Sequence, residues 1–240
     1  MRLGFMQPYF FPYPGYFALI AASDTWLVFD DAQMIRHGWV DRNRILHPEE
    51  GWQYIKVPTR KHRRGSPIRA VEASADRDWR ARLLRQLGHY RKAPHHDEVY
   101  AWLETTLAGA PDNLALLTES TLSATCARLG IPFTPIRHSS LDYDRGAVNG
   151  PGDWALEAAR HLRATAYVNP VGGEALFEPT RFAAAGCRLE VLEWTPTPYR
   201  QGRRPFEPGL SILDMMMHCS VDEIRSRIAR ARIRSAETSP

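Results

Sequence analysis

The chain has 240 residues, of which 44 % are hydrophobic and 24 % charged, with a formal net charge of +4. This composition excludes a disordered chain and allows a substantial core, so we expect one α/β domain over residues 1–240. No apolar run reaches the ~20 residues of a membrane span, and the N-terminus lacks signal-peptide features, so we expect a cytoplasmic protein. Three cysteines without paired metal-type spacing indicate reduced thiols.

The N-terminal part of the chain reads as the opening of an α/β fold. Residues 2–7 (RLGFMQ) and 25–33 (TWLVFDDAQ) predict strands, with a helix over 16–22 between them. Such a βαβ unit implies a parallel sheet with ligands at the carboxyl ends of its strands. A third strand is predicted over 52–59.

The rest of the chain alternates between helices and strands. Apolar residues recur at helical spacing over 76–130, which predicts a helical middle segment. Further elements are strands over 131–140, 165–170 and 187–194, and helices over 153–162, 210–217 and 221–233. The predicted fold class is therefore α/β, a Rossmann-like parallel sheet flanked by helices, with a more helical middle.

An aromatic turn, QPYFFPYPGYF, joins the first strand to the first helix. Its Pro14 and Gly15 indicate a tight entry into the helix, whose free amide groups can receive an anion or a carbonyl oxygen. Four side chains have polar ends that need partners: Gln7, Tyr9, Tyr13 and Tyr16. The turn therefore suits a ligand pocket, although Phe10, Phe11 and Phe17 fit a core-capping role equally well.

The segment after the second strand, DDAQMIRHGWVDRNRI, is dense in polar chemistry. Asp30 or Asp31 could act as a general base or hold a cation, and Tyr9 completes the candidate catalytic set; solvated carboxylates are the plain alternative. Adjacent residues of a strand point to opposite faces, so at most one carboxylate enters the pocket easily. Arginine side chains suit bidentate contacts with phosphate or carboxylate. Candidate substrate-binding residues here are Gln33, His37, Arg42, Asn43 and Arg44.

Three further features carry weaker signals. Gly172 and Gly173 could place backbone amides against an anion, or form a simple turn. Asp214 interrupts an apolar helix, and a buried carboxylate there needs a partner, for which the arginines of 42–44 are candidates. The basic run 60–64 could attract phosphates or an acidic carrier protein, or be a solvated loop. It lacks a recognition motif, so specific nucleic-acid binding is not favoured, and the sequence identifies neither a metal site nor a cofactor.

Several motifs in order resemble the WbqC-like protein family: QPYFFPYPGYF, DDAQ with RHGWVDRNRI, YRKAPHH, CARLGIPFT, AYVNPVGG and YRQGRRPFEPGLSILD. The resemblance implies an enzyme, or a close partner of enzymes, in the assembly of bacterial surface polysaccharide such as O-antigen, or of amino-sugar and natural products. It also singles out Tyr199, Gln201 and Asp214. The opening alone is similar in plan to pantothenate synthetases and related nucleotidyltransferases, but their His-x-Gly-His is replaced by residues 13–16, whose phenols cannot supply cationic imidazoles.

These observations lead to one functional hypothesis and two alternatives. We expect a transferase that forms an amide or ester by acyl or aminoacyl transfer to a small-molecule amine or sugar. Asp30 or Asp31 would accept the acceptor's proton, while Arg42 and Arg44 hold a phosphate or carboxylate. The alternatives are an ATP-dependent ligase or nucleotidyltransferase-like enzyme, and a noncatalytic binding or scaffold protein.

Overall fold

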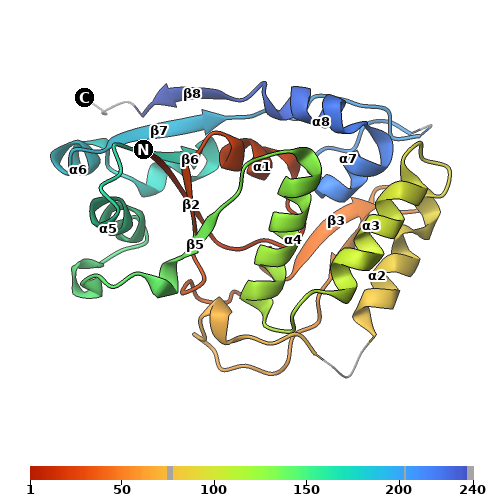
Figure 1. The fold of residues 1–240 in the computed structure, drawn as a ribbon, viewed down its shortest axis with the longest axis horizontal. Coiled ribbons are helices and arrows are strands. Elements are labelled where there is room, and N and C mark those ends of the chain that lie inside the picture. Colours follow the sequence, from red (N-terminus) through yellow and green to blue (C-terminus); the bar gives the residue numbers. More distant parts are fainter. Residues whose placement is uncertain (75–77, 203, 237–240) are drawn as a thin grey trace.

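The structure, a computed structural model, describes residues 1–74, 78–202 and 204–236, and its main element is a six-stranded sheet (Figure 1). The strand order is β5-β2-β1-β6-β7-β8, in which all neighbouring pairs are parallel except the antiparallel β7–β8 pair at one edge. The strands are β1 (Arg2–Met6), β2 (Thr25–Val28), β5 (Pro135–Arg137), β6 (Ala166–Pro170), β7 (Arg188–Glu193) and β8 (Arg232–Ser235). This arrangement confirms the predicted Rossmann-like α/β class.

Helices cover both faces of this sheet, because alternate side chains of each strand point to opposite sides. Leu3, Phe5 and Leu27 pack in one apolar cluster with α5 and α6, whereas Trp26 and Val28 pack in another with α1, α4 and α8. Figure 1 shows these two groups of helices on opposite sides of β2 and β5. The helices are α1 (Pro14–Ala21), α4 (Leu114–Leu129), α5 (Asp153–His161), α6 (Pro179–Ala184) and α8 (Val221–Ile228).

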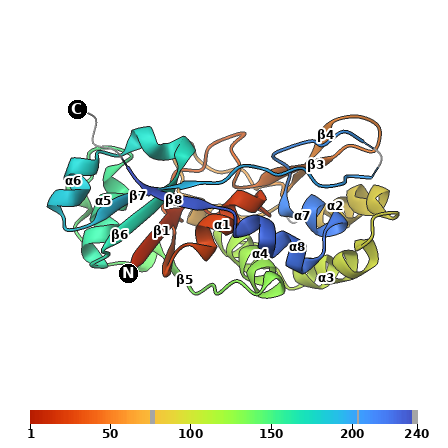
Figure 2. The ribbon, with the colours of Figure 1, turned by 90° about the horizontal axis from the view of Figure 1, so that it is seen from above.

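A more helical part extends beyond α1, away from α5 and α6 (Figure 2). It contains α2 (Trp79–Leu87), α3 (His96–Ala108), α7 (Ile212–His218) and an antiparallel hairpin of β3 (Arg42–Leu46) and β4 (Trp52–Lys56). Short 3₁₀ helices are η1 (Ile68–Ala70), η2 (Gly88–Tyr90), η3 (His138–Ser140), η4 (Arg145–Ala147) and η5 (Val171–Leu176). No helix in the described ranges has the length and apolarity to cross a membrane.

One predicted helix is shorter in the structure, one strand was not predicted, and one predicted helix start lies outside the described residues. The helical segment was expected from Asp76, which lies outside the described residues; α2 begins at Trp79, where the Asp78 side chain caps it by accepting a hydrogen bond from the Ala81 amide at 3.1 Å. The helix predicted over 221–233 ends at Ile228, and the following residues form β8, because the open edge of β7 supplies backbone partners. Strand β3 was not predicted, since its polar sequence RNRIL resembled a binding cluster.

The strand order reverses between β1 and β6. From β1 the chain proceeds outward to β2 and β5, and then returns to add β6 and β7 on the other side. In open parallel sheets, ligands bind in the crevice outside the carboxyl ends of the strands at such a reversal. The topology therefore places a candidate site beyond β1 and β6.

Candidate functional site

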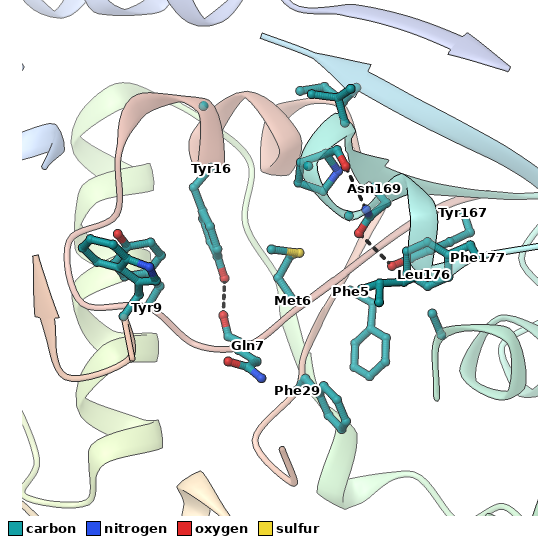
Figure 3. A pocket seen from close by; sticks show the side chains of 18 of the residues that line it. Phe5, Met6, Gln7, Tyr9, Tyr16, Phe29, Tyr167, Asn169, Leu176 and Phe177 are labelled. Atoms are coloured by element: carbon teal, nitrogen blue, oxygen red, sulfur yellow. Dashed lines mark hydrogen bonds between the residues drawn. The ribbon is translucent and has the colours of Figure 1, made fainter. Parts of the chain in front are cut away.

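A cavity of about 570 Å³ lies at this reversal and is called the aromatic cavity below (Figure 3). Its wall comes from residues 5–9 at the end of β1, the start of α1, Phe29 after β2, Trp154 on α5, residues 167–177 around the end of β6, and Trp194 after β7. Trp39, from the loop between β2 and β3, also lines it. Segments far apart in sequence thus meet because the parallel strands end at one edge of the sheet.

The wall of the aromatic cavity carries no Asp, Glu, Lys, Arg or His side chain among the described residues. Its ionisable groups are the phenols of Tyr9, Tyr13, Tyr16 and Tyr167. Burial raises the pKa of each of them above the ordinary value of a tyrosine. The phenols are therefore neutral at physiological pH, and the cavity offers aromatic faces and neutral hydrogen-bonding groups rather than charge.

Hydrogen bonds fix two of the phenols and leave another free. The Tyr16 hydroxyl donates to the Gln7 carbonyl oxygen at 2.7 Å, and the Tyr167 hydroxyl donates to Asn169 Oδ1 at 3.2 Å (Figure 3). Within residues 1–74, 78–202 and 204–236, the Tyr13 hydroxyl and the exposed Gln7 side chain have no hydrogen-bond partner. These two groups are available to a ligand.

Glycine allows close packing of side chains against the backbone at two places in the wall. A Cβ atom on Gly15 would lie 2.5 Å from the Tyr13 ring and 2.7 Å from the Trp194 ring. A Cβ on Gly173 would lie 2.4 Å from Asn169 Nδ2. Both glycines therefore let side chains of the wall approach the backbone more closely than any other residue would.

The aromatic turn is held in place from the far side of the cavity wall. Phe11 has a positive φ of 40°, which a non-glycine residue seldom adopts. The buried Asn43 side chain donates to the carbonyl oxygens of Phe10, at 3.4 Å, and Phe11, while Ser211 Oγ donates to the latter at 2.7 Å. Asn43, predicted to bind substrate, thus supports the turn, and its Oδ1 accepts a long 3.5 Å contact from the Tyr9 hydroxyl.

Asp30 and Asp31 do not line the aromatic cavity, contrary to the expectation that carboxylates and phenols share it. Phe29 occupies the wall, and the two carboxylates lie toward the end of β5. Asp30 accepts hydrogen bonds from the Ser139 amide at 2.9 Å and its hydroxyl at 2.5 Å. Asp31 is paired with Arg69 at 2.5 Å and Arg145 at 3.0 Å.

The pKa of Asp31 reflects these partners. Partial burial acts to raise it, but the hydrogen bonds from Arg69 and His138 and the charge of Arg145 outweigh burial, so the pKa lies below its usual value. A carboxylate with a lowered pKa is a weak base. Its geometry and its pKa both favour a structural role over proton abstraction.

His138 was not among the predicted site residues, although it connects this network to the cavity. It is fully buried; its Nδ1 lies 2.8 Å from Asp31 Oδ2 and its Nε2 lies 2.5 Å from the Tyr143 hydroxyl. Its ring stacks on Phe5 at 5.4 Å and makes edge-to-face contacts with Phe29 at 5.1 Å and Trp154 at 5.3 Å, and all three of these residues line the aromatic cavity. Burial lowers the pKa of His138, and Asp31 opposes this only in part. Its position at the end of a predicted strand was the signal that could have found it.

Asp30, Asp31 and His138 have possible metal-ligand atoms within 4.8 Å of one another. The guanidinium groups of Arg69 and Arg145 already neutralise Asp31, and both oxygens of Asp30 accept hydrogen bonds from Ser139. A cation would have to displace these partners. The arrangement is therefore better described as a satisfied ion-pair network than as a metal site.

The other predicted residues are distributed over the surface and the core. Gln33 and His37 are exposed on the loop after β2. Arg42 donates to the Gly38 carbonyl oxygen at 2.9 Å and lies 4.4 Å from the centre of the Tyr54 ring, whereas Arg44 donates to the Gly209 carbonyl oxygen at 3.1 Å. Neither arginine lines the aromatic cavity. Residues that do line it are Gln7, Tyr9, Tyr13, Tyr16, Gly172 and Gly173.

Asp214 is fully buried, and its predicted pairing with an arginine of 42–44 is wrong. Its carboxylate accepts hydrogen bonds from the Tyr90 hydroxyl at 2.6 Å, the Tyr199 hydroxyl at 2.5 Å and Gln201 Nε2 at 2.8 Å. Neutral donors from two distant segments, η2 and the chain after β7, satisfy it. Tyr199 and Asp214 thus lie in a network of their own, outside the aromatic cavity.

Comparison with known proteins identifies, over most of the chain, the family that the sequence motifs resemble. The model of the WbqC-like protein family matches residues 7–226. The chain is 29 % identical over 225 residues, 92 % of its own length and 95 % of the relative's, to a Mycobacterium tuberculosis (strain ATCC 25618 / H37Rv) protein described as "Uncharacterized protein Rv1507c". No solved structure matches the chain significantly.

Proposed function

Since the chain belongs to the WbqC-like protein family, we propose that it is a transferase of glycan or specialised-metabolite assembly whose amine or amino-sugar acceptor binds in the aromatic cavity. The observation that supports this most is the wall itself, which combines aromatic rings with a few neutral polar groups at the strand reversal. A sugar ring presents an apolar C–H face and hydroxyl groups, which match rings and amides respectively. The Tyr13 hydroxyl and the Gln7 amide would bind the acceptor's hydroxyl groups.

The proposed reaction is acyl or aminoacyl transfer that yields an amide or ester. A bond forms between the acceptor nitrogen or oxygen and the donor's carbonyl carbon, the bond from that carbon to the leaving group breaks, and the acceptor's proton passes to the leaving group. This route fits a cavity whose described wall has no ionised base. Tyr9 would orient the acceptor, and Asp30 and Asp31 would act as positioning residues behind the wall.

The ligase or nucleotidyltransferase alternative is favoured by the strand reversal, where nucleotides bind in many α/β proteins. It is opposed by the neutral wall, because a triphosphate needs cationic groups or a metal ion to neutralise it. The two functions therefore differ in the ligand that the aromatic cavity accepts.

Tryptophan fluorescence tests the proposal directly, since Trp39, Trp154 and Trp194 line the cavity. We expect saturable quenching by amino sugars or simple amines, weakened in Tyr13→Phe and unchanged in Tyr100→Phe, a control on α3 outside the cavity. Mass spectrometry of the acceptor after incubation with acyl-thioester donors would then detect the amide. Thermal stabilisation by ATP and magnesium, with no response to any amino sugar or amine, would reject the transferase in favour of the alternative.

A further inference from the structure

A second cavity, of about 800 Å³, lies in the more helical part of the molecule and is called the basic cavity below. Its wall comes from residues 46–48 at the end of β3, residues 89–94 around η2, residues 200–202 with Arg204, and His218 at the end of α7. Two of these segments belong to motifs that the proposed function does not use, YRKAPHH and YRQGRRPFEPGLSILD. The basic cavity shares no lining residue with the aromatic cavity.

Among the described residues, the ionisable groups in the wall of the basic cavity are Tyr90 and six basic or potentially basic side chains. The six are His47, His89, Lys92, Arg200, Arg204 and His218. No carboxylate of a described residue lines it. Lys92 and Arg200 are exposed, while Arg204 is held by donation to the carbonyl oxygens of His47 and Pro48. The cavity thus combines an arginine fixed in its wall with exposed cationic side chains, which suits an anionic ligand.

Two imidazoles of this wall have buried nitrogens without a partner among the described residues. His89 Nδ1 donates to the Gln86 carbonyl oxygen at 2.6 Å, and its Nε2 is buried and unpaired. The His218 side chain is only 8 % exposed, and its Nε2 is likewise unpaired. Buried polar atoms almost always have a partner, so two open imidazoles in one cavity indicate a group that is supplied from outside.

The buried carboxylate of Asp214, which lies beneath the basic cavity, explains how His218 could carry a charge. Its Nε2 lies 4.0 Å from Asp214 Oδ1, which is too long for a hydrogen bond but close enough to stabilise an imidazolium. Burial lowers the pKa of His218, and Asp214 opposes this while His95 adds to it. Burial also lowers the pKa of His89; the hydrogen bond to the Gln86 carbonyl oxygen and the charge of Asp214 oppose this, while Arg204 and His47 add to it. A bound anion would add a second negative charge to that of Asp214, and it would therefore favour protonation of the His89 and His218 rings.

We propose that the basic cavity binds a phosphorylated small molecule, with its phosphate among Lys92, Arg200 and His218. The proposal is independent of the transferase function, because it rests on different residues and a different ligand chemistry. The volume is in the range of sites for molecules of nucleotide size.

Calorimetry with sulfate and pyrophosphate at constant ionic strength tests this proposal. Sulfate stays a dianion in the range used, so any pH dependence of its binding belongs to the protein. We expect saturable binding that strengthens from about pH 8 to about pH 5.5, with proton uptake detected in buffers of different ionisation enthalpy. His218→Gln should weaken binding by about tenfold and reduce the proton uptake, while His62→Gln, an exposed control, should change neither.

Because substitution of the buried His218 could disturb folding, two charge-matched double variants of exposed residues provide a second test. Lys92→Ala with Arg200→Ala removes two exposed cations from the basic cavity, and Lys61→Ala with Arg63→Ala removes two from the exposed loop 60–64. Only the first pair should weaken pyrophosphate binding. Equal losses in both pairs, or no saturable binding by either anion, would overturn the proposal. Tighter binding of a nucleoside diphosphate than of pyrophosphate would identify the ligand as a nucleotide, and equal binding would identify the phosphate group alone.

Discussion

The aromatic cavity and the basic cavity show two ways in which one chain builds a site. The aromatic cavity is assembled from strand ends at the edge of a parallel sheet, and its wall is neutral in the described residues. The basic cavity is assembled from loops around α7, and it places cations and imidazoles over a buried carboxylate. The kind of ligand that each cavity suits therefore depends on which elements meet in the folded chain. Arg42 and Arg44 support this, because they were predicted to bind the same ligand as the aromatic turn but do not line its cavity.

The largest expected loss of stability follows from removing the Asp214 carboxylate beneath the basic cavity. Asp214→Ala leaves the Tyr90, Tyr199 and Gln201 donors without their buried acceptor, so the free energy of unfolding should fall by about 3 kcal/mol. Urea titration measures this loss. Asp142→Ala, an exposed control, should stay within about 0.5 kcal/mol of the parent. A similar small change in Asp214→Ala would show that the network does not stabilise the fold.

The next largest loss of stability should follow from removing the Asn43 side chain, which supports the aromatic turn. Asn43→Ala removes the donor to the Phe10 and Phe11 carbonyl oxygens in a fully buried place, which should cost about 2 kcal/mol. Ligand quenching of tryptophan fluorescence should weaken as well, because the turn carries Tyr9 and Tyr13. Asn149→Ala, whose side-chain bond to the Ala147 carbonyl oxygen is exposed, is the matched control. Unaltered stability of Asn43→Ala would mean that the turn is held by packing alone.

The two cavities should also differ in their response to pH. Burial lowers the pKa values of His89, His138 and His218, so the folded state disfavours their protonation. This contribution to stability is complete above the ordinary histidine pKa of about 6.5 and is lost as the pH falls through the lower folded values. The melting temperature should therefore decrease below about pH 6.5. Sulfate should offset this decrease if it binds at His89 and His218.

Binding in the aromatic cavity should be independent of pH between about 6 and 9, because its buried phenols stay neutral there. Fluorescence titrations of an uncharged ligand at several pH values check this. An ionisation within that range would show that a charged group outside the described wall takes part.

The smallest expected changes in stability distinguish the hydroxyl groups of Tyr16 and Tyr13. Tyr16→Phe removes the hydrogen bond to the Gln7 carbonyl oxygen and should cost about 1 kcal/mol of stability. Tyr13→Phe removes a hydroxyl that has no partner among the described residues, so stability should change by less than about 0.5 kcal/mol while ligand affinity decreases. Equal stability losses in the two variants would contradict a free Tyr13 hydroxyl.

Much of the fold could be predicted from the sequence, because it depends on local patterns. The run of β-forming residues in 25–28 and the apolar spacing of 114–129 each specify one element, and the βαβ opening specifies a parallel pair. Strand β8 could not be predicted, since its sequence RIRS is short and polar and is a strand only because the edge of β7 lies beside it.

The residues predicted for the candidate site that line the aromatic cavity come from the aromatic turn and from the glycine pair Gly172 and Gly173. Gln7, Tyr9, Tyr13 and Tyr16 come from one turn, and their clustering follows from their nearness in sequence. Asn169 and Trp194 come from distant strand ends and Trp154 from the start of α5, and no local pattern connects them. The basic cavity escaped prediction for the same reason.

The sequence by itself determined the parallel α/β core and the aromatic turn, because both follow from the periodicity and turn chemistry of contiguous residues. The tertiary structure alone decided where the charges lie. It directs Asp31 to Arg69 and His138 behind the wall, and it buries Asp214 beneath His218, since burial and pairing of a charge depend on which distant groups can satisfy it.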